Sequence, residues 1–565
     1  MLRKFFVIPL TLILALSASA QIKVRTSEEL KEVLTSNKDV GVVLLDGDWF
    51  HLEGIQVNIG GTIKPYGNRK PVLVGFQQTV NRNKDTRVQG GYWTAHVTGY
   101  GAAHYIFLDQ NFEAIKRATT VDGKEFMYLM ASDLQRTDKA TRFVKIKVPS
   151  GYASLLNKSE SDLKNAMLKV GYWFVQFNIY NLKSDGKYLY GQIDNSYNYE
   201  LLDIRSKANV TVSFFNFPSE DGGIFFDGKD ILHVPVKYST VRMCCSNNIL
   251  TLNGNRTLAI EGITFTGSMK PIVIQGANKH IYNCSFKNCG DGVFCDYGTT
   301  NKESKCSVKN CRFDDLYNNN AISFVGCDDV LIANNITHNT GLVNKSGSVI
   351  RVGGKNFKVE HNEIKGYSYM GISVGTRDLT AKITGYINDN LVDNAENWGL
   401  ADKQLSDGGG IYVITHTDGI VVENNIVRNI GYENSELWGI YFDDGAYNCT
   451  VRHNLVYNIW PGQYAMTSRL VEECERSCIN NVFEDNIFIG PCKIAGNRRG
   501  LGKKTIIRNN YIAGDLNTQG DEFVFLDGNK FISAAVGKDG KIVTGKGERI
   551  KKRGFSRSIK KLIKR

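Results

Sequence analysis

Two short segments of the chain place an aspartate beside a Gly-Ile-Tyr triplet. The first is Asp407 in SDGGGIYVI (406–414), and the second is Asp443 in WGIYFDDGAY (438–447). Paired carboxyl groups are what cleavage of a glycosidic bond needs, because one acid protonates the leaving oxygen while the other attacks the sugar or activates water. The two segments therefore indicate acid–base chemistry on a sugar, although an aspartate before glycine is also a common turn residue.

Other polar and aromatic residues accompany the two aspartates. Asp444 follows Asp443 directly and is an alternative member of the acid pair. Tyr412 and Tyr441 supply aromatic faces on which a sugar ring can stack. His416 is either a second acid/base or sugar contact, or an ordinary loop histidine. We expect one carboxyl of the pair to have a raised pKa, because a neighbouring carboxylate and a partly dry cleft both disfavour its charge.

The elements that must position these residues are repeats of the pattern apolar-x-x-Asn-x-apolar. The copies lie at 359–364, 387–392, 422–427, 451–456, 483–488 and 507–512, with cysteine in the fourth place at 281–286 and 308–313. The residues at the fourth place, together with Asn335, which lies between the second and third copies in chain order, follow one another at intervals of 24 to 35 positions. This period indicates a solenoid. The units contain short β-branched and aromatic runs without helical periodicity, so we predict an all-β, right-handed parallel β-helix.

The fourth place of the repeat also predicts a structural role for its asparagines. Asparagine tolerates the left-handed backbone region that a turn uses. Its amide can bond the asparagine of the next coil and form an internal ladder. We therefore expect Asn425 and Asn454 to lie in stacked turns with buried side chains.

The period fixes which residues of neighbouring coils stack. Ile411 and Ile440 each lie fourteen residues before a repeat asparagine, so Tyr412 should lie over Tyr441 at about 4.8 Å. Strand alternation puts isoleucine inward and tyrosine outward. The predicted outward row is Ser323, Arg351, Ser373, Tyr412 and Tyr441.

Two further predictions about the site follow from the outward row. We expect Asp443 to face outward at the end of its strand and Asp407 to precede its strand in a Gly-rich turn. We also expect Tyr412→Ala to weaken substrate binding more than stability, since the ring is predicted to face solvent.

The chain divides into five segments. The N-terminus has a basic start, an apolar run and Ala18-Ser19-Ala20 before Gln21, which is typical of a secretory signal. Residues 81–235 lose the asparagine period and are rich in aromatic residues, which predicts an inserted β-sandwich or barrel-like domain. The predicted segments are a signal peptide (1–20), a cap and first coil (21–80), the insertion (81–235), the parallel β-helix (236–530) and a basic tail (531–565).

Charge and cysteine content limit the classes of partner. The net charge is +12, of which residues 546–565 carry +9 and Arg3 and Lys4 carry +2, so the rest of the chain carries 12 − 9 − 2 = +1. A nearly neutral body argues against a nucleic-acid-binding protein. The basic tail is either solvated or a contact for a surface or polyanion. Twelve cysteines show no metal-type spacing with histidine, and their pairing stays open.

The chain resembles bacterial β-helix carbohydrate-active enzymes, most closely glycoside hydrolase family 141 and its unclassified relatives. The resemblance rests on DGGGIY (407–412), GIYFDDGAYNCTVRHNLVY (439–457) and the insertion, and it covers most of residues 24–515. It implies hydrolysis of plant-type glycans by two aspartates on adjacent coils, which match Asp407 and Asp443. The chain departs at 217–235, where relatives often carry a Pro-Gly-Glu-Trp-like motif.

Two other functions remain open on the same fold. A polysaccharide lyase needs a basic residue near the sugar and often Ca²⁺, and Arg351, Lys355 or Arg377 could supply the base. A non-catalytic glycan-binding surface protein needs neither.

For the hydrolase we expect a polysaccharide or oligosaccharide substrate, no cofactor or metal, no nucleic acid, no transmembrane segment and a monomer. The signal, with no cysteine after its cleavage site, predicts a periplasmic or extracellular protein that is not a lipoprotein; retaining and inverting outcomes stay open.

Overall fold

The computed structural model of the 565-residue chain describes most of residues 21–544. The gaps are 76–77, 85, 87, 90, 98–105, 112, 116–125, 138–141, 173–174, 194–208, 216–222, 228–230, 245–247, 298–301, 345, 376–381, 396–405, 415–416, 433–434, 470–477, 496–504, 520–523 and 537–541. The expected signal peptide (1–20) lies outside the described residues. No helix within the described ranges is long and apolar enough to cross a membrane.

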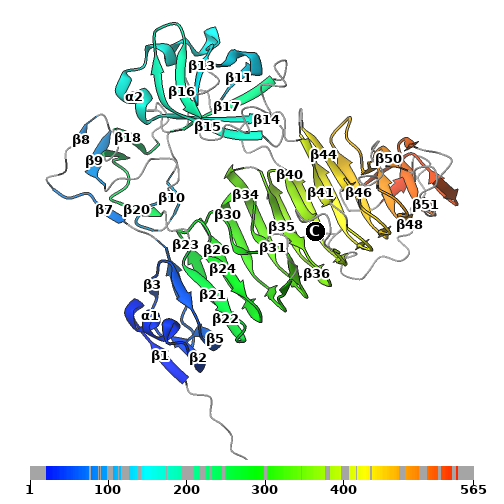
Figure 1. Ribbon diagram of the computed structural model, residues 1–565, viewed down its shortest axis with the longest axis horizontal. Helices are drawn as coiled ribbons and strands as arrows, with labels where there is room; N and C mark the ends of the chain where they lie inside the picture. Colours follow the sequence, from blue (N-terminus) through cyan, green and yellow to red (C-terminus); the bar gives the residue numbers. More distant parts are fainter. Residues whose placement is uncertain are drawn as a thin grey trace, which may run out of the picture.

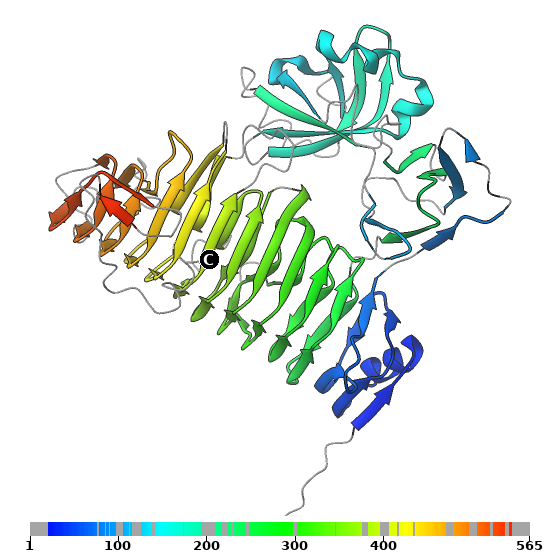
Figure 2. The same cartoon turned by 180° about the vertical axis from the view of Figure 1, so that it is seen from behind.

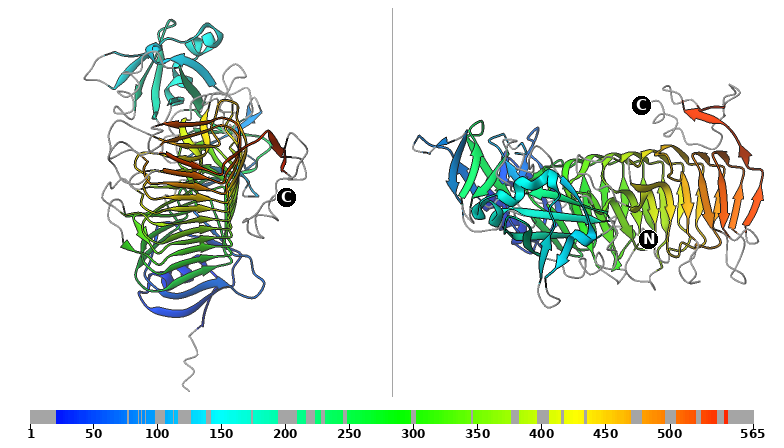
Figure 3. Two further views of the ribbon diagram at one scale, coloured as in Figure 1. Left: turned by 90° about the vertical axis from the view of Figure 1, so that its right-hand side faces the viewer. Right: turned by 90° about the horizontal axis from the view of Figure 1, so that it is seen from above.

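Three long parallel sheets form a right-handed β-helix, as predicted from the repeat. Sheet A has 14 strands, sheet B has 13 and sheet C has 12, and the chain visits one strand of each sheet in every complete coil. Figures 1 and 2 show the coils stacked in chain order along one axis. Figure 3 shows the same stack of coils from two further directions.

The solenoid strands lie in chain order along each sheet. Sheet A consists of β1 (Gln21–Val24), β2 (Asp39–Leu45), β5 (Gly60–Pro65), β22 (Leu258–Glu261), β25 (Lys279–Tyr282), β29 (Ser307–Lys309), β33 (Leu331–Ala333), β36 (Phe357–Glu360), β39 (Gly385–Asn388), β42 (Val421–Glu423), β45 (Thr450–Arg452), β48 (Val482–Glu484), β51 (Thr505–Arg508) and β54 (Val524–Asp527). Sheet B consists of β3 (Trp49–His51), β6 (Val72–Val74), β23 (Thr264–Thr266), β26 (Ser285–Lys287), β30 (Arg312–Asn318), β34 (Ile336–Asn344), β37 (Glu363–Tyr367), β40 (Leu391–Ala395), β43 (Ile426–Ile430), β46 (Leu455–Ile459), β49 (Ile487–Ile489), β52 (Tyr511–Ala513) and β55 (Lys530–Phe531). Sheet C consists of β4 (Ile55–Val57), β21 (Leu250–Gly254), β24 (Ile272–Gly276), β27 (Val293–Asp296), β31 (Ile322–Val325), β35 (Ser348–Gly353), β38 (Met370–Val374), β41 (Ser406–Val413), β44 (Glu436–Phe442), β47 (Met466–Ser468), β50 (Cys492–Ala495) and β53 (Leu516–Gln519). A short pair, β28 (Lys302–Glu303) with β32 (Cys327–Asp328), lies beside them.

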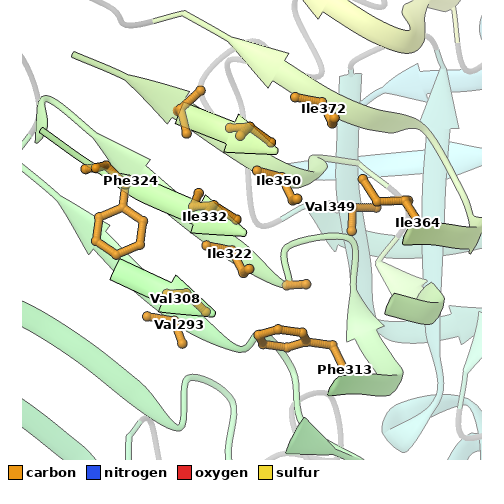
Figure 4. Packing of buried hydrophobic residues seen from close by; sticks show 14 of the residues in the cluster. Val293, Val308, Phe313, Ile322, Phe324, Ile332, Val349, Ile350, Ile364 and Ile372 are labelled. Atoms are coloured by element: carbon orange, nitrogen blue, oxygen red, sulfur yellow. The ribbon is translucent and has the colours of Figure 1, made fainter. Parts of the chain in front are cut away.

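The interior of the solenoid is filled by apolar side chains from all three sheets. Figure 4 shows Ile322 and Ile350 of sheet C near Ile332 of sheet A and Phe313 and Ile364 of sheet B. All five side chains are fully buried. Each coil repeats this arrangement, so the solenoid has one continuous apolar core.

A ladder of buried asparagines joins successive coils along one corner of the solenoid, as predicted. From Asn362 onward, each ladder side-chain oxygen accepts hydrogen bonds from the backbone N–H and the side-chain amide of the ladder asparagine one coil earlier, at 2.9 to 3.1 Å. The oxygen of Asn335, the first ladder residue, accepts from Cys311 N–H at 2.9 Å. Each described ladder amide also donates to a backbone carbonyl, as Asn425 does to Ile387. The ladder residues are Asn335, Asn362, Asn390, Asn425, Asn454, Asn486, Asn510 and Asn529.

The expectation that the ladder asparagines adopt the left-handed backbone conformation is wrong. The residue before each one adopts it instead, with φ of 57° at His361, 56° at Asn424 and 55° at His453. The preceding residue makes the turn and directs the following side chain inward. The ladder position therefore selects asparagine for its amide, and the preceding position selects residues that tolerate positive φ.

An amphipathic helix covers the N-terminal end of the solenoid. Helix α1 (Ser27–Thr35) begins at Thr26, whose side chain accepts from Glu29 N while the Glu29 side chain accepts from Thr26 N. Leu30 and Leu34 of α1 are buried in the core.

The insertion consists of three antiparallel sheets between β6 and β21, in agreement with the predicted inserted β-domain. Its apolar residues form two separate clusters, one around Trp93 and Val241 and the other around Leu168 and Phe214. Figures 1 and 3 show it beside the solenoid. Its elements are β7 (Gln78–Asn81), β8 (Val88–Gln89), β9 (Tyr92–His96), β10 (Ile106–Leu108), β11 (Phe126–Met130), the 3-10 helix Ala131–Asp133, β12 (Leu134–Arg136), β13 (Phe143–Ile146), the 3-10 helix Ser150–Asn157, α2 (Glu160–Asn165), β14 (Met167–Tyr172), β15 (Val175–Ser184), β16 (Leu189–Ile193), β17 (Asn209–Phe215), β18 (Phe225–Asp227), β19 (Ile231–Pro235) and β20 (Thr240–Cys244).

Strand β10 of the insertion contacts the solenoid. Ile106 and Leu108 are buried against Met269 and Tyr317 of the neighbouring coils. Glu113 forms an ion pair with Lys287 of β26 at 2.8 Å. These contacts fix one end of the insertion on the solenoid surface.

A hairpin near the C-terminus lies on the outer face of sheet B. It is formed by β56 (Ala534–Val536) and β57 (Ile542–Thr544), which pair antiparallel. Ile542 is fully buried in a cluster with Leu391, Ile426, Leu455 and Ile487. The first part of the expected tail is therefore folded against the solenoid, and residues 545–565 lie outside the described residues.

Replacing a ladder asparagine should destabilise the solenoid. Asn425→Ala leaves the N–H and amide of Asn390 without their buried acceptor, so we expect the free energy of unfolding to fall by about 1–3 kcal/mol. Chemical denaturation followed by circular dichroism measures the change. Asn517→Ala, at an exposed position of β53, is the matched control and should change stability by less than about 0.5 kcal/mol. Equal effects of the two substitutions would contradict a stabilising ladder.

Candidate functional site

The two aspartate segments lie on adjacent strands of sheet C. Ile411 pairs with Ile440 and Tyr412 with Tyr441 between β41 and β44. The register also places Ser323, Arg351, Ser373, Tyr412 and Tyr441 in one row across five coils. The predicted stacking of these five residues in one row is therefore confirmed.

The expectation that the two tyrosine rings face solvent is wrong. Tyr412 is 5% exposed and Tyr441 is 4% exposed. Their ring centroids are 5.0 Å apart with a tilt of 53°, and the Trp438 ring packs edge-on against Tyr441 at 4.4 Å. Neighbouring side chains cover the outward face here, so the tyrosines do not offer a sugar-stacking platform. Tyr412→Ala becomes a substitution that opens a buried space and costs stability.

The tyrosines instead hold the two carboxyl groups through crossed hydrogen bonds. Tyr412, on the same strand as Asp407, donates its hydroxyl to Asp443 Oδ2 at 2.8 Å. Tyr441, on the strand that precedes Asp443, donates to Asp407 Oδ1 at 3.1 Å. Each tyrosine therefore bonds the aspartate of the other coil. The stacking of the coils brings the two carboxyl groups into one cluster.

Asp407 is the extra residue of a β-bulge within β41, and it does not precede the strand as expected. Ser406 pairs with Glu436 and Gly408 pairs with Leu437, so Asp407 has no partner on β44. Its φ is +64°, which is uncommon for a residue other than glycine. The bulge turns its side chain toward Tyr441.

Tyr369 on the preceding coil contacts the bulge. Its hydroxyl donates to the backbone carbonyl of Asp407 at 3.1 Å, and its side chain is 5% exposed. A Cβ atom at Gly408 would lie 2.5 Å from the Tyr369 ring. The glycine after Asp407 is therefore required by close packing.

Asp443 is surrounded by hydrogen-bond donors. Besides Tyr412, it receives the backbone N–H of Asp444 at 2.9 Å and Arg469 Nη1 at 3.2 Å. Arg469 Nη1 also lies 3.7 Å from Asp444 Oδ1. Arg469 follows β47 and stands one coil above Asp443, because Phe442 pairs with Ser468. The cluster thus combines three aspartates with one arginine.

Burial and neighbouring charge perturb the titration of the cluster. Burial raises the pKa of Asp407, and the nearby Asp443 charge raises it further, while the Tyr441 hydrogen bond acts in the opposite direction. The predicted raised pKa of one carboxyl is therefore found at Asp407. Burial also raises the pKa of Tyr441, followed by the charges of Asp443 and Asp407. Burial acts to lower the pKa of Arg469, but the charges of Asp443, Tyr441 and Asp444 and the hydrogen bond to Asp443 together outweigh it, so the net pKa is raised.

The other predicted site residues lie apart from this cluster or outside the described residues. Arg351 is partly exposed on β35, two coils from Tyr412 in the same row, or about 10 Å away. Lys355 is exposed just after β35. His416 and Arg377 lie outside the described residues.

Three residues of the cluster, Arg469, Tyr369 and Trp438, were not predicted from the sequence. Arg469 could have been found by extending the register one coil to MTSR (466–469), where it matches Asp443. Tyr369 and Trp438 carry no comparable signal, because their contacts depend on the bulge and on ring orientation.

The two aspartates should affect stability in opposite directions. The folded protein raises the pKa of Asp407 above its unfolded value, so the folded state binds more protons and this carboxyl lowers stability as pH rises above about 4. We expect Asp407→Asn to raise the melting temperature at pH 7, with a gain that shrinks toward pH 4. Thermal unfolding across this pH range measures the gain.

Asp443→Asn is the matched control for that experiment. It leaves Arg469 and the Tyr412 hydroxyl without the carboxylate that they bond, so the free energy of unfolding should fall by about 1–3 kcal/mol at pH 7. A loss of stability in Asp407→Asn at pH 7 would contradict the assigned direction of its pKa.

Comparisons with known proteins agree with the fold. Residues 222–385 match a family model described as a right handed beta helix region. No curated protein sequence matches the chain. A solved structure named "Glycoside hydrolase" is similar at 12% identity and a TM-score of 0.52, covering 91% of this chain and 96% of that one.

Two further solved structures are similar, one to most of the chain and the other to about half of it. A complex of XylC with xylose has 11% identity and a TM-score of 0.46, covering 93% of this chain and 88% of that one. A mannuronic acid specific polysaccharide family 6 lyase from human gut microbiota has 14% identity and a TM-score of 0.32, covering 52% and 80%. At these identities, the likeness to the glycoside hydrolase structure shows a shared fold: the chain is a right-handed parallel β-helix protein.

Proposed function

We propose that the protein is an exported glycoside hydrolase that acts on a complex polysaccharide. The observation that carries the proposal is the meeting of Asp407 and Asp443 from adjacent coils, each held by a tyrosine of the other coil. One carboxyl has a raised pKa and the other receives an arginine. This asymmetry is the property that separates an acid from its partner carboxylate.

The roles of the two carboxyl groups follow from their surroundings. Asp407, with the raised pKa, keeps its proton and donates it to the oxygen of the leaving sugar. Asp443, with three donors directed at its oxygens, acts as the second carboxylate, which attacks the anomeric carbon or takes a proton from the attacking water. Overall, water is added across one carbon–oxygen bond.

Access to the two carboxyl groups differs. Asp407 is partly exposed, whereas the side chain of Asp443 is 3% exposed and that of Asp444 is 19% exposed. Arg469, with 42% of its side chain exposed, contacts both Asp443 and Asp444. A substrate that displaces Arg469 would reach Asp443. Asp444 is the alternative second carboxylate, and the variants below separate the two.

Two similarities support hydrolysis over the alternatives. The glycoside hydrolase structure shares the fold over 91% of this chain, and the sequence resembles glycoside hydrolase family 141. The raised pKa of Arg469 makes it a poor base for elimination. A polysaccharide lyase or a glycan-binding surface protein are the alternative outcomes of the experiment.

A panel of plant and host glycans tests the reaction class. We expect new reducing ends without an ultraviolet signal. Absorbance near about 235 nm, which marks an unsaturated uronate, would instead indicate elimination, and binding without either product would indicate a surface protein. On a substrate that is cleaved, Asp407→Asn and Asp443→Asn should each lower turnover by a factor of about 10² or more.

Three controls accompany these variants. Circular dichroism at the assay temperature establishes that each variant is folded. Asp444→Asn should retain turnover within about tenfold if Asp443 is the second carboxylate, and the reverse pattern would exchange their roles. Asp314→Asn, at an aspartate on β30 that pairs with Arg312, is a matched surface control and should keep full activity. Full turnover in both Asp407→Asn and Asp443→Asn would overturn the proposed site.

A further inference from the structure

The solenoid core contains cysteine thiols that the proposed site does not use. Within the described part of the chain, nine cysteines are buried and outside any disulfide: Cys284, Cys289, Cys295, Cys306, Cys311, Cys327, Cys449, Cys478 and Cys492. Two of them approach each other closely. Cys327 Sγ lies 3.3 Å from Cys295 Sγ on the neighbouring coil.

The backbone brings these two thiols together by an offset between coils. Cys295 on β27 pairs with Phe324 on β31, so residues in register stack as neighbours in the sheet. Cys327 comes three residues later, after Gly326 at φ +68° turns the chain. The turn returns the Cys327 side chain toward Cys295, so the thiols meet from different directions. A disulfide would require the Sγ–Sγ distance of 3.3 Å to shorten to about 2.0 Å.

The surroundings of the pair are dry and closed. Cys295 is 0% exposed and Cys327 is 1% exposed. The Tyr297 hydroxyl next to them donates to Gly276 O at 3.0 Å. The Cys295 pKa is raised by the contact with Cys327 and then by burial. Thiolate is the attacking species in disulfide exchange, so the pair reacts while the coils are still open and is protected once they close.

We propose that Cys295 and Cys327 form a structural disulfide between successive coils when the protein folds in an oxidising compartment. The oxidant is a disulfide-carrying protein or a small-molecule disulfide. One thiolate attacks a sulfur of that donor and releases one donor thiol. The second thiolate then attacks the mixed disulfide and releases the other. The two cysteines lose two electrons and two protons, and the donor disulfide is reduced to two thiols.

The bond would fasten the coil of β27 to the coil of β31. The two residues are 32 positions apart, and a cross-link over such a loop restricts the unfolded chain. The inference is independent of the glycosidase proposal, because no atom of this pair belongs to the aspartate cluster.

Peptide mapping of the whole protein tests the bond. The protein is secreted through the oxidising compartment of a host cell, denatured without reductant, alkylated with iodoacetamide and digested with trypsin. We expect two of the twelve cysteines to resist alkylation until reduction. The tryptic peptide 288–302 should be recovered joined to peptide 313–345, and reductant should separate them.

Cys289 shares the first peptide with Cys295, so matched variants assign the bond. Cys289→Ser, at another fully buried thiol, should keep the joined peptides, and Cys295→Ser should abolish them. Fragment ions of the wild-type peptides assign the same sulfur if Cys295→Ser does not fold. The oxidised wild type should also melt at a higher temperature than protein refolded with reductant. Complete alkylation before reduction, or a link through Cys289 or Cys306, would overturn the proposal.

Discussion

The buried asparagine ladder is the interaction on which the rest of the solenoid depends. Each amide bonds both the backbone and the side chain of its neighbour, and this geometry is satisfied only when successive coils stack without an offset. From the coil of Asn335 to that of Asn529, the ladder corner therefore holds neighbouring coils in register. The placement of Tyr412 over Tyr441, and of Arg469 over Asp443, follows from that register.

Sequence alone predicted the features that depend on periodicity. The asparagine spacing gives the β-helix, its register and the row that contains the two tyrosines, because these follow from counting residues between equivalent positions. The loss of the period indicates the insertion, which the structure divides into two apolar clusters. That division rests on antiparallel pairing between distant strands, such as β11 with β17, for which the chain carries no periodic signal.

The candidate site departs from these rules where local geometry breaks the period. Asp407 occupies a bulge that inserts one residue into β41, so counting from Ile411 cannot give its direction. An outward side chain is not necessarily exposed, and the burial of Tyr412 depends on what packs above it. The site thus combines a regular scaffold with one irregular residue, a combination typical of functional positions.

The C-terminal hairpin has a consequence for cooperativity. A solenoid held only by contacts between neighbouring coils can fray from its ends, one coil at a time. Ile542 belongs to one apolar cluster with residues from four consecutive strands of sheet B, β40, β43, β46 and β49, so loosening any of these strands also disturbs the cluster. These coils carry the two aspartate strands, and the hairpin joins them into one unit that opens together or remains closed.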